Sequence, residues 1–529
     1  MSARAIMVLG TASHVGKSLL ATALCRILAD DGYRVAPFKA QNMSLNSAAT
    51  PEGREIGRAQ AMQAEAARIA PSVEMNPVLL KPTSDVGSQI VLLGHVHGVQ
   101  RAAEYHRRRV DEFFPIVVKA YRSLAARHDV IVLEGAGSPA EINLKATDIV
   151  NMRMAHAADA ACLLVGDIDR GGAFAALLGT WALLEPHERA RIQGFAINKF
   201  RGDLALLAPG VTEIEHRIGV PSLGVVPWLP DVGLDEEDSV AFDDAPRVTT
   251  RGWSASVDAS RALRVAVVSL PYLANATDFA ALASEPSVDL AYAECPADLE
   301  GADIVVLPGT KDTLGALRWL EGDFGIAIKA FARRKPVVGI CGGYQILGLD
   351  VADPHGVEGG GARRGLGLLP VRTILAREKV TRGVRVRPRH LALFDHDLAG
   401  TGLLEGSGYE IHMGRTEIDG DARPFADLAR DGGERVADGA VSSSGLVIGT
   451  YVHGLFADDP LRWAFVRAAR VRCHLSPPPE LIPYGANRDA RFNRLAAHVR
   501  ASLNLSPLLK ASSSGADFSD RSWQTVGNR

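Results

Sequence analysis

The sequence has few cysteines, no long apolar run and no excess of charge of either sign. Its five cysteines lie far apart among 529 residues, with no C-x-x-C pair. This argues against a disulfide framework and fits a reducing cytosol. No apolar run approaches the ~20 residues of a membrane span, and the first residues lack the basic and apolar regions of a secretory signal. We therefore expect a cytoplasmic protein with no membrane partner.

The charge balance and the apolar content exclude two further classes. Lys and Arg total 58 against 61 Asp and Glu, a formal net charge of −3, so no strongly basic face is implied and nucleic acid is disfavoured as a partner. Hydrophobic residues make up 47% of the chain, which is enough to exclude disorder over most of its length. At roughly 150 residues per domain, the length predicts two to four domains.

The pattern of the first half predicts an α/β domain over residues 1–230. Short runs rich in Val, Ile and Leu alternate with amphipathic stretches that predict helices. The runs lie at 5–9, 130–133, 161–165, 194–197 and 222–226, and the clearest helical stretches are 18–30 and 55–69. Buried strands that alternate with helices are typical of a parallel sheet covered on both faces.

The second half predicts another α/β domain, separated from the first by a linker. Residues 231–261 are acidic and polar with no clear period, as expected of a linker. Strand-like runs resume at 264–270, 303–307 and 336–340, which predicts a domain over 262–460. Residues 461–505 have a helical pattern, and the polar stretch 506–529 predicts a disordered tail.

The strongest early motif is a phosphate-binding loop, LGTASHVGKSL, between the first strand and the first helix. Backbone N–H groups of residues 11–17 can ring a phosphate at the helix N-terminus, and Gly10, Thr11 and Gly16 are candidate ATP-binding residues of this loop. Lys17 would reach the β- and γ-phosphates of ATP, and the Ser18 hydroxyl would bind Mg²⁺. Five residues separate the two glycines, one more than in the usual motif. A glycine turn that merely joins strand to helix is the alternative.

Polar groups follow three further strands of the same predicted sheet. Glu134 ends VLEGAGS and is a candidate Mg²⁺ ligand, because this ion prefers hard oxygen donors. Asp167, Asp169 and Arg170 lie in GDIDRGG, and Arg170 is suited to a phosphate or a substrate carboxylate. Asn198, in NKFRGD, is a candidate for hydrogen bonding to adenine. Each loop alone also fits ordinary solvated loop chemistry.

The segment FKAQNMSLNS at 38–47 is rich in amide and hydroxyl groups for a connecting loop. Gln41, Asn42, Ser44 and Asn46 are therefore candidates for binding a large ligand with many carboxylate or amide groups. A capped and solvated loop is the alternative.

The second half contains a cysteine nucleophile elbow, VVGICGGYQI. Glycines on both sides of Cys341 allow the tight strand-to-helix turn that exposes a nucleophile. The backbone N–H groups of Gly342 and Gly309 are candidates for an oxyanion hole. Among the 15 histidines, His453 in GTYVHGL has the right context for the general base, just after a strand. A histidine packed in the core or on the surface is the alternative.

These motifs resemble known families. The second half resembles class I glutamine amidotransferases, which implies that Cys341 attacks the glutamine side-chain amide and that His453 is the general base. Most of that class carries Glu two residues after the histidine, whereas Leu455 stands here. The resemblance therefore implies a Cys/His pair without an acidic third member. The first half is similar to dethiobiotin synthetase in its phosphate-binding loop and its EGAG strand end.

The order of all the motifs is more specific. The phosphate-binding loop, KAQNMSLNS, EGAGSPAEINL, GDIDRGG, NKFRGD, the cysteine elbow and TYVHGLF together resemble the cobyric acid synthase family, over residues 1 to about 490. The resemblance implies a cobalamin-biosynthesis ligase that uses ATP, Mg²⁺ and glutamine to amidate the b, d, e and g carboxylates of adenosylcobyrinic acid a,c-diamide. The expected partner is thus a corrinoid small molecule, and the sequence does not indicate an oligomeric state.

Two other interpretations remain open from the sequence. One is a sister ligase, either cobyrinic acid a,c-diamide synthase or another ligase fused to a glutaminase; the NKFRGD and QNMSLNS elements argue against it. The other is a P-loop ATPase of the chromosome-partition type with a non-catalytic second domain. That interpretation leaves the cysteine elbow without a purpose.

Overall fold

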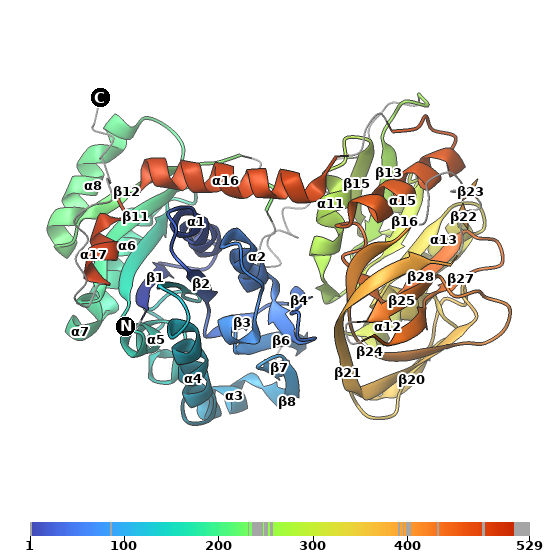
Figure 1. Ribbon diagram of the computed structural model, residues 1–529, viewed down its shortest axis with the longest axis horizontal. Helices are drawn as coiled ribbons and strands as arrows, with labels where there is room; N and C mark the ends of the chain where they lie inside the picture. The colour runs from blue at the N-terminus through green and yellow to red at the C-terminus, as the bar shows by residue number, and fades with distance from the viewer. Residues whose placement is uncertain are drawn as a thin grey trace.

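The computed structural model in Figure 1 has two α/β domains side by side, and a long C-terminal helix lies along both. The structure describes residues 3–84, 87–230, 232–234, 247, 252–253, 258–389, 392–394, 396–397, 404–430, 433–478 and 482–512. The predicted linker at 231–261 falls largely outside these ranges. Among the described residues, no helix combines the length and apolarity needed to cross a membrane.

The first domain is built on a six-stranded, wholly parallel sheet. In sheet order its strands are β12 (Ser222–Pro227), β11 (Ile192–Phe200), β10 (Ala161–Asp167), β1 (Arg4–Gly10), β9 (Val130–Glu134) and β2 (Val35–Phe38). The flanking α-helices are α1 (Lys17–Asp30), α2 (Arg58–Ala66), α4 (Phe114–Ala125), α5 (Met152–Ala157), α6 (Ala173–Leu183), α7 (Pro186–Arg189) and α8 (Leu204–Ile218). Because all six strands run the same way, their carboxyl ends lie at one edge of the sheet.

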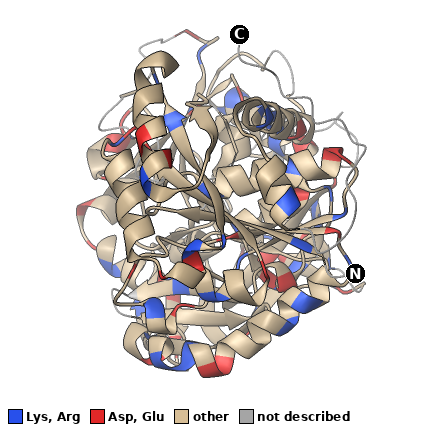
Figure 2. Cartoon of the chain, turned by 90° about the vertical axis from the view of Figure 1, so that its left-hand side faces the viewer, with Lys and Arg blue, Asp and Glu red and all other residues tan. Residues whose placement is uncertain are grey.

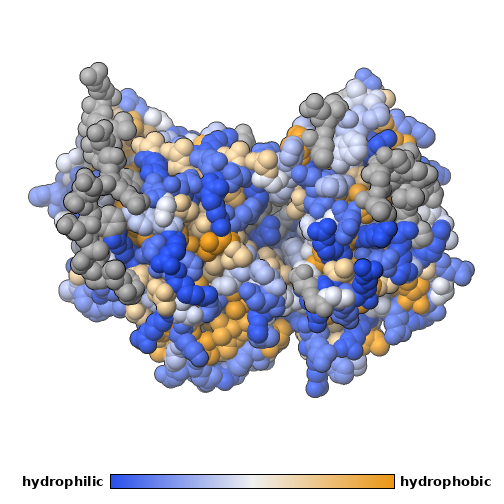
Figure 3. Space-filling view, in the orientation of Figure 1, coloured by the Kyte–Doolittle hydropathy of each residue, from blue (hydrophilic) through white to orange (hydrophobic). Residues whose placement is uncertain are grey.

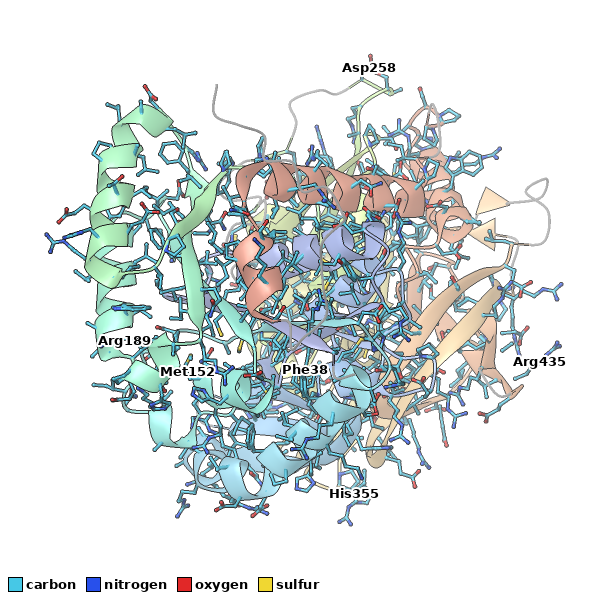
Figure 4. All side chains as sticks on the ribbon, turned by 60° about the vertical axis from the view of Figure 1, so that its left-hand side comes forward. Phe38, Met152, Arg189, Asp258, His355 and Arg435 are labelled. Carbon is cyan, nitrogen blue, oxygen red and sulfur yellow. The ribbon has the colours of Figure 1, made fainter. Side chains whose placement is uncertain are left out.

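Two apolar cores cover the two faces of this sheet. Alternate residues of β1 enter different cores, with Met7 in one and Val8 in the other, and both are fully buried. This explains why the strands read as continuous apolar runs rather than as alternating patterns. Figure 4 labels Phe38, the last residue of β2, deep inside the molecule, and Arg189 at its periphery.

A smaller sheet connects this domain to the second one. It has the order β3 (Gln41–Met43), β6 (Val78–Ser84), β7 (Gly87–Leu92) and β8 (His95–Arg101). Beside it, β4 (Ser47–Ala49) and β5 (Glu55–Gly57) form an antiparallel pair, and α3 (Ala102–Arg108) follows β8. The segment predicted to be helical over 55–69 therefore begins as strand β5, and its α-helix covers only α2.

The second domain has two sheets. The first has the order β15 (Val288–Ala293), β13 (Leu263–Val268), β16 (Ile304–Leu307), β18 (Val337–Ile340), β28 (Val447–Thr450) and β27 (Ala440–Val441), and only β27 is antiparallel. The second contains β20 (Gly361–Arg364), β19 (Asp350–Asp353), β21 (Val371–Pro388), β24 (Gly406–Ile418), β29 (Val452–His453), β25 (Ala426–Arg430) and β26 (Arg435–Asp438).

Short helices and hairpins complete the second domain. The helices are α11 (Ala280–Ala283), α12 (Thr313–Trp319), α13 (Asp323–Ala332), α14 (Gly342–Leu347) and α15 (Asp459–Arg472). The small strand pairs are β14 (Leu273–Ala274) with β17 (Gly309–Thr310), and β22 (Ala392–Leu393) with β23 (His396–Asp397). The 3₁₀ helix η4 (Ala276–Phe279) directly follows β14.

The C-terminal helices return to the first domain. Helix α16 (Tyr484–Ser502) packs against α1, where buried Arg26 hydrogen-bonds the Asn493 side chain. The prediction of a disordered tail from residue 506 is wrong at its start. Residues Ser506–Ala511 form helix α17, because Leu508 and Leu509 are buried against the first sheet. The remainder of the predicted tail lies outside the described residues.

The outer surface is largely polar. Figure 2 shows acidic and basic residues intermingled on the face formed by the first domain. Figure 3 shows hydrophilic side chains over most of the face drawn in Figure 1, with small apolar patches between them.

Candidate active sites

The phosphate-binding loop joins β1 to α1 in the predicted strand–loop–helix context. Gly16 has φ +96°, and a Cβ atom there would lie 2.2 Å from Asn198 Nδ2, so only glycine fits without a clash. Buried Lys17 lies over the loop, and its Nζ donates to Ala12 O at 2.8 Å and Gly137 O at 3.2 Å. An ammonium group held by loop carbonyls is positioned for a phosphate at the α1 N-terminus.

One predicted detail of this loop differs. The Thr11 N–H donates to Val165 O at 2.9 Å and thereby extends the pairing of β1 with β10. In this structure that amide is engaged by the sheet and does not face the loop interior. Asn198 also has a structural task, because its Nδ2 donates to Val15 O at 2.8 Å. Its contact with adenine stays a prediction.

Glu134, at the end of β9, is the centre of a buried hydrogen-bond network. Its Oε1 accepts from Ser18 Oγ at 2.8 Å and from Lys39 Nζ at 2.9 Å. Its Oε2 accepts from Gln63 Nε2 at 2.6 Å. Glu134 is 1% exposed, so these partners replace the hydration of its charge. Lys39 and Gln63 were not among the predicted residues, although Lys39 lies within the FKAQNMSLNS motif.

The Ser18–Glu134 pair fits a magnesium ion. Two oxygen donors lie within one hydrogen bond of each other beside the phosphate-binding loop, and Mg²⁺ usually takes one or two protein oxygens with phosphate and water completing its shell. Within the described ranges, no cluster of three or more His, Cys, Asp or Glu residues is suited to hold a metal ion. A magnesium ion at this pair would complete its shell with phosphate oxygens and water.

Two further strand ends meet at the same edge. Asp167, at the end of β10, pairs with Lys199 Nζ at 2.9 Å, and the same ammonium donates to His14 O in the loop at 2.7 Å. Asp169 lies 3.5 Å from the Arg201 guanidinium, while Arg170 is exposed. The sheet thus brings these residues together as the parallel topology predicts, and their contact with substrate stays a prediction.

The amide-rich segment at 41–47 is buried rather than open. Gln41 Oε1 accepts from Tyr105 Oη at 2.6 Å, and Asn42 Nδ2 donates to Gln60 Oε1 at 3.1 Å. Ser44 Oγ caps the Asn46 N–H at 3.0 Å. The segment is polar because it fills a buried junction, where every polar atom needs a partner. Substrate binding by Gln41, Asn42, Ser44 and Asn46 stays a prediction.

In the second domain, Cys341 lies between β18 and α14 with φ 52° and ψ −110°. A non-glycine residue in this region is strained, and such strain is typical of the nucleophile elbow. A Cβ atom at Gly343 would lie 1.9 Å from Leu307 O, so the glycine after the turn allows the helix to approach the neighbouring strand. The thiol is partly exposed.

His453, on β29, lies close enough to Cys341 for the cysteine to raise the pKa of the imidazole. The Cys341 thiol itself donates to Ile411 O at 3.5 Å. The acidic partner that the local sequence lacks is supplied by Asp278 on η4. Its Oδ2 lies 2.6 Å from His453 Nδ1, and its Oδ1 accepts from the Gly454 N–H at 2.9 Å. The implied Cys/His pair without an acidic third member is therefore wrong in this structure, because the acid comes from a segment 175 residues upstream.

The pKa of His453 is set by two opposing effects, burial and the neighbouring charges. Burial lowers the pKa of His453, but the Asp278 carboxylate and Cys341 outweigh burial and raise that pKa to about 10. With Asp278 on Nδ1, the second ring nitrogen is left for proton exchange with the sulfur. The three residues thus have the connectivity of nucleophile, base and orienting acid.

Both predicted oxyanion-hole residues lie beside the nucleophile. A Cβ atom at Gly309 would lie 3.8 Å from Cys341 Cβ and 3.4 Å from His453 Cε1. Gly342 begins α14 immediately after the cysteine. Their role in stabilising an oxyanion stays a prediction.

The domains meet over a buried charged cluster and an open cavity. Glu55, fully buried, pairs with Lys81 of its own domain at 2.7 Å and with Lys379 of the second domain. A cavity of about 1060 Å³ adjoins this cluster and has lining residues from both domains. They include Gly53, His95, Arg377, Lys379, Arg382, His412 and Arg415.

Comparisons with known proteins agree with this geometry. Residues 6–240 match a family model described as a CobQ/CobB/MinD/ParA nucleotide binding domain, and residues 264–461 match a CobB/CobQ-like glutamine amidotransferase domain. The first match covers the phosphate-binding loop, and the second covers Cys341, His453 and Asp278.

Full-length relatives extend the match. The chain is 49% identical to the cobyric acid synthase of Klebsiella pneumoniae subsp. pneumoniae, over 94% of this chain and 96% of that protein. It is 48% identical to the cobyric acid synthase of Yersinia enterocolitica, over 96% and 97%, and 49% identical to that of Sorangium cellulosum, over 95% and 98%. The chain is therefore a glutamine amidotransferase that belongs to the cobyric acid synthase family.

Proposed function

We propose that this chain amidates the b, d, e and g carboxylates of adenosylcobyrinic acid a,c-diamide with ATP, Mg²⁺ and glutamine. The observation that carries the proposal is the presence of two complementary sites in one chain. Cys341, His453 and Asp278 form a hydrolytic triad in one domain. Lys17, Ser18 and Glu134 lie beside the phosphate-binding loop in the other, where they would hold phosphate and Mg²⁺. The family supplies the substrate class.

The glutaminase half-reaction begins with the Cys341 sulfur. It attacks the side-chain amide carbon of glutamine, and the C–N bond breaks as ammonia leaves with a proton from His453. The resulting thioester is hydrolysed by water, which returns the free thiol and releases glutamate. The N–H groups of Gly342 and Gly309 would stabilise the oxyanion in both steps.

The synthetase half-reaction makes a carboxylate reactive. A carboxylate resists amines because its leaving group would be oxide, whereas an acyl phosphate releases phosphate. Transfer of the ATP γ-phosphoryl group to the substrate oxygen forms that acyl phosphate, and ammonia then displaces phosphate to give the amide. Lys17 offsets the charge that develops on the transferred group, and Ser18 with Glu134 would hold Mg²⁺.

The domain junction supports a corrinoid ligand with several carboxylates. The cavity between the domains is large, and its lining includes Arg377, Arg382 and Arg415. Arginine matches carboxylates through paired hydrogen bonds. A partition-type ATPase with an inactive second domain does not account for the Cys341–His453–Asp278 arrangement.

The direct experiment is a reconstitution with a mass readout. Purified protein is incubated with the a,c-diamide substrate, ATP, Mg²⁺ and glutamine, and exchanges of hydroxyl for amino groups are counted by mass spectrometry. We expect exchange at each of the b, d, e and g positions, and no exchange without ATP. Omission of Mg²⁺ tests the metal separately. A product unchanged in mass would contradict the proposal. A parallel reaction with cobyrinic acid in which only the a and c carboxylates are amidated would contradict it as well.

A further inference from the structure

The two catalytic domains touch through main-chain and side-chain hydrogen bonds next to the glutaminase base. The Ser47 N–H, from β4 of the first domain, donates to Asn275 Oδ1 of the second domain at 2.9 Å. In the opposite direction, the Ala276 N–H donates to Asn46 Oδ1 at 3.1 Å. Ser47 and Asn275 are 0% and 3% exposed, so water cannot replace these bonds. We call this pair of segments, 44–47 and 275–278, the Ser47 bridge.

The same serine also holds a second neighbour of His453. The Tyr409 hydroxyl donates to Ser47 O at 3.4 Å. The Tyr409 ring stacks on the His453 imidazole with a centroid distance of 5.4 Å and an interplanar angle of 20°. Asn275 Nδ2 lies 3.4 Å from the same imidazole. The backbone of one residue of the first domain therefore contacts two groups that flank the catalytic histidine of the second.

The bridge also fixes the acid of the triad. Asn275 is in the left-handed region with φ 57° and ψ 45°, and it is the residue from which η4 starts. The Asp278 N–H donates to Asn275 O at 2.9 Å, so the position of Asn275 sets that of the Asp278 carboxylate on His453. The contacts that the imidazole makes with Asp278 and with Asn275 Nδ2 thus both depend on the position of Asn275, which accepts from the Ser47 N–H.

On the other side, the bridge continues toward the nucleotide site. Ser47 pairs with Gly57 in the β4–β5 ladder, and Gly57 directly precedes α2. Gln63, on α2, donates to Glu134. Consecutive packed elements therefore connect the glutaminase base with the carboxylate at the phosphate-binding loop.

We propose that Asn275 and Tyr409 are positioning residues through which the first domain holds His453 in its reactive orientation. Glutamine hydrolysis then depends on segment 44–47 of the first domain. This inference rests on the proposed function, because it assumes both half-reactions. It adds residues outside the Cys341–His453–Asp278 triad, and it assigns the buried amides of segment 44–47 a task other than substrate contact.

The test first compares glutamine-driven with ammonia-driven amidation in two variants. Tyr409→Phe removes only the hydroxyl and keeps the stacked ring. Asn275→Gly removes the amide and tolerates the left-handed backbone. We expect kcat for glutamine to fall about threefold to tenfold in the first and about tenfold to a hundredfold in the second. KM for glutamine and ammonia-driven turnover should remain close to those of the wild type.

The matched control is Ser47→Ala. It removes the Oγ that accepts from Lys81 Nζ, but it keeps the N–H and C=O that form the bridge. We expect glutamine turnover to change less than in Tyr409→Phe. If Ser47→Ala lowered kcat for glutamine more than Tyr409→Phe and Asn275→Gly do, the proposal would be overturned.

A pH profile separates positioning from general damage. The titratable groups that face His453 are Asp278, Cys341 and the stacked Tyr409. Asn275→Asp keeps an acceptor for the Ser47 N–H and adds a negative charge beside the imidazole, so the alkaline limb of glutamine hydrolysis should move to higher pH. Asn275→Gly should lower kcat without that shift.

Two further outcomes contradict the inference. One is unchanged glutamine turnover in both Tyr409→Phe and Asn275→Gly, and the other is an equal loss with ammonia. These outcomes differ from failure of the proposed function, in which the wild-type protein itself amidates no corrinoid with either nitrogen source.

Discussion

The two active sites differ in how the fold assembles them. The nucleotide site gathers residues that follow strands of one parallel sheet, so Lys17, Ser18 and Glu134 meet wherever that topology holds. The glutaminase site obtains its nucleophile in the same way, but the acid on His453 comes from a short 3₁₀ helix. Sheet topology therefore determines where reactive groups lie, whereas the orientation of the base depends on segments that no strand-end rule predicts.

The largest expected effect comes from the triad acid. Asp278→Asn should lower kcat/KM for glutamine about 10²- to 10⁴-fold, because the amide neither holds the imidazole tautomer nor stabilises its charge. Ammonia-driven amidation should persist. The Asp278 carboxylate is the largest contribution that raises the pKa of His453 to about 10. Its loss should therefore move the alkaline limb of glutamine hydrolysis to lower pH.

Steady-state kinetics across pH with both nitrogen sources check this prediction. A variant that retained the wild-type limb would show that Asp278 does not control His453.

A smaller effect is expected at the nucleotide site, and there the nitrogen source should not matter. Ser18→Ala removes the hydroxyl that bonds Glu134 Oε1 and should lower glutamine-driven and ammonia-driven amidation equally, by about a hundredfold. Ser18→Thr keeps the hydroxyl and should recover most of both activities. Initial rates with glutamine and with an ammonium salt measure both effects. A loss confined to the glutamine-driven rate would contradict the assignment of Ser18 to the synthetase site.

The smallest expected effect concerns stability. Glu410 is 2% exposed and bonded to His412 and Arg430. Burial alone would raise the pKa of Glu410, but its hydrogen bonds to His412 and Arg430 lower it to about 2 from 4.5. Its contribution is therefore present above pH 4.5 and is lost as the pH falls toward 2.

Glu410→Gln should lower the free energy of unfolding at neutral pH by about 3 kcal/mol and flatten the acid dependence. Urea unfolding curves from pH 7 to pH 3 measure both effects. An acid dependence as steep as that of the wild type would exclude Glu410 as its source.

Much of each site was predictable from the sequence because the signals are local. The glycine loop, the strand-end acids and the cysteine between glycines each combine a special backbone shape with a reactive group. Asp278 has no such local signal, because the sequence NATD at 275–278 indicates only a polar turn. Leu455, which occupies the place of the usual acid, is buried in the apolar core. Its substitution by Glu would bury an unpaired charge and is not expected to restore a base partner.

Two other differences have a common cause. The polar segment at 38–47 was interpreted as a ligand-binding segment, with a capped and solvated loop as the alternative, and helix α17 was interpreted as part of a disordered tail. In the structure, distant partners bury them: Asn275 and Ala276 contact the first, and the apolar face of the parallel sheet covers the second. The composition of a segment does not show whether residues distant in sequence bury it, so burial of these two segments could not be predicted.

The central claim is that one domain releases ammonia and the other consumes it. The most direct measurement compares Cys341→Ser with Lys17→Ala, using glutamine and then an ammonium salt as the nitrogen source. We expect Cys341→Ser to lose only glutamine-driven amidation and Lys17→Ala to lose amidation from both sources. Loss of ammonia-driven amidation in a folded Cys341→Ser protein, or its survival in Lys17→Ala, would contradict the account.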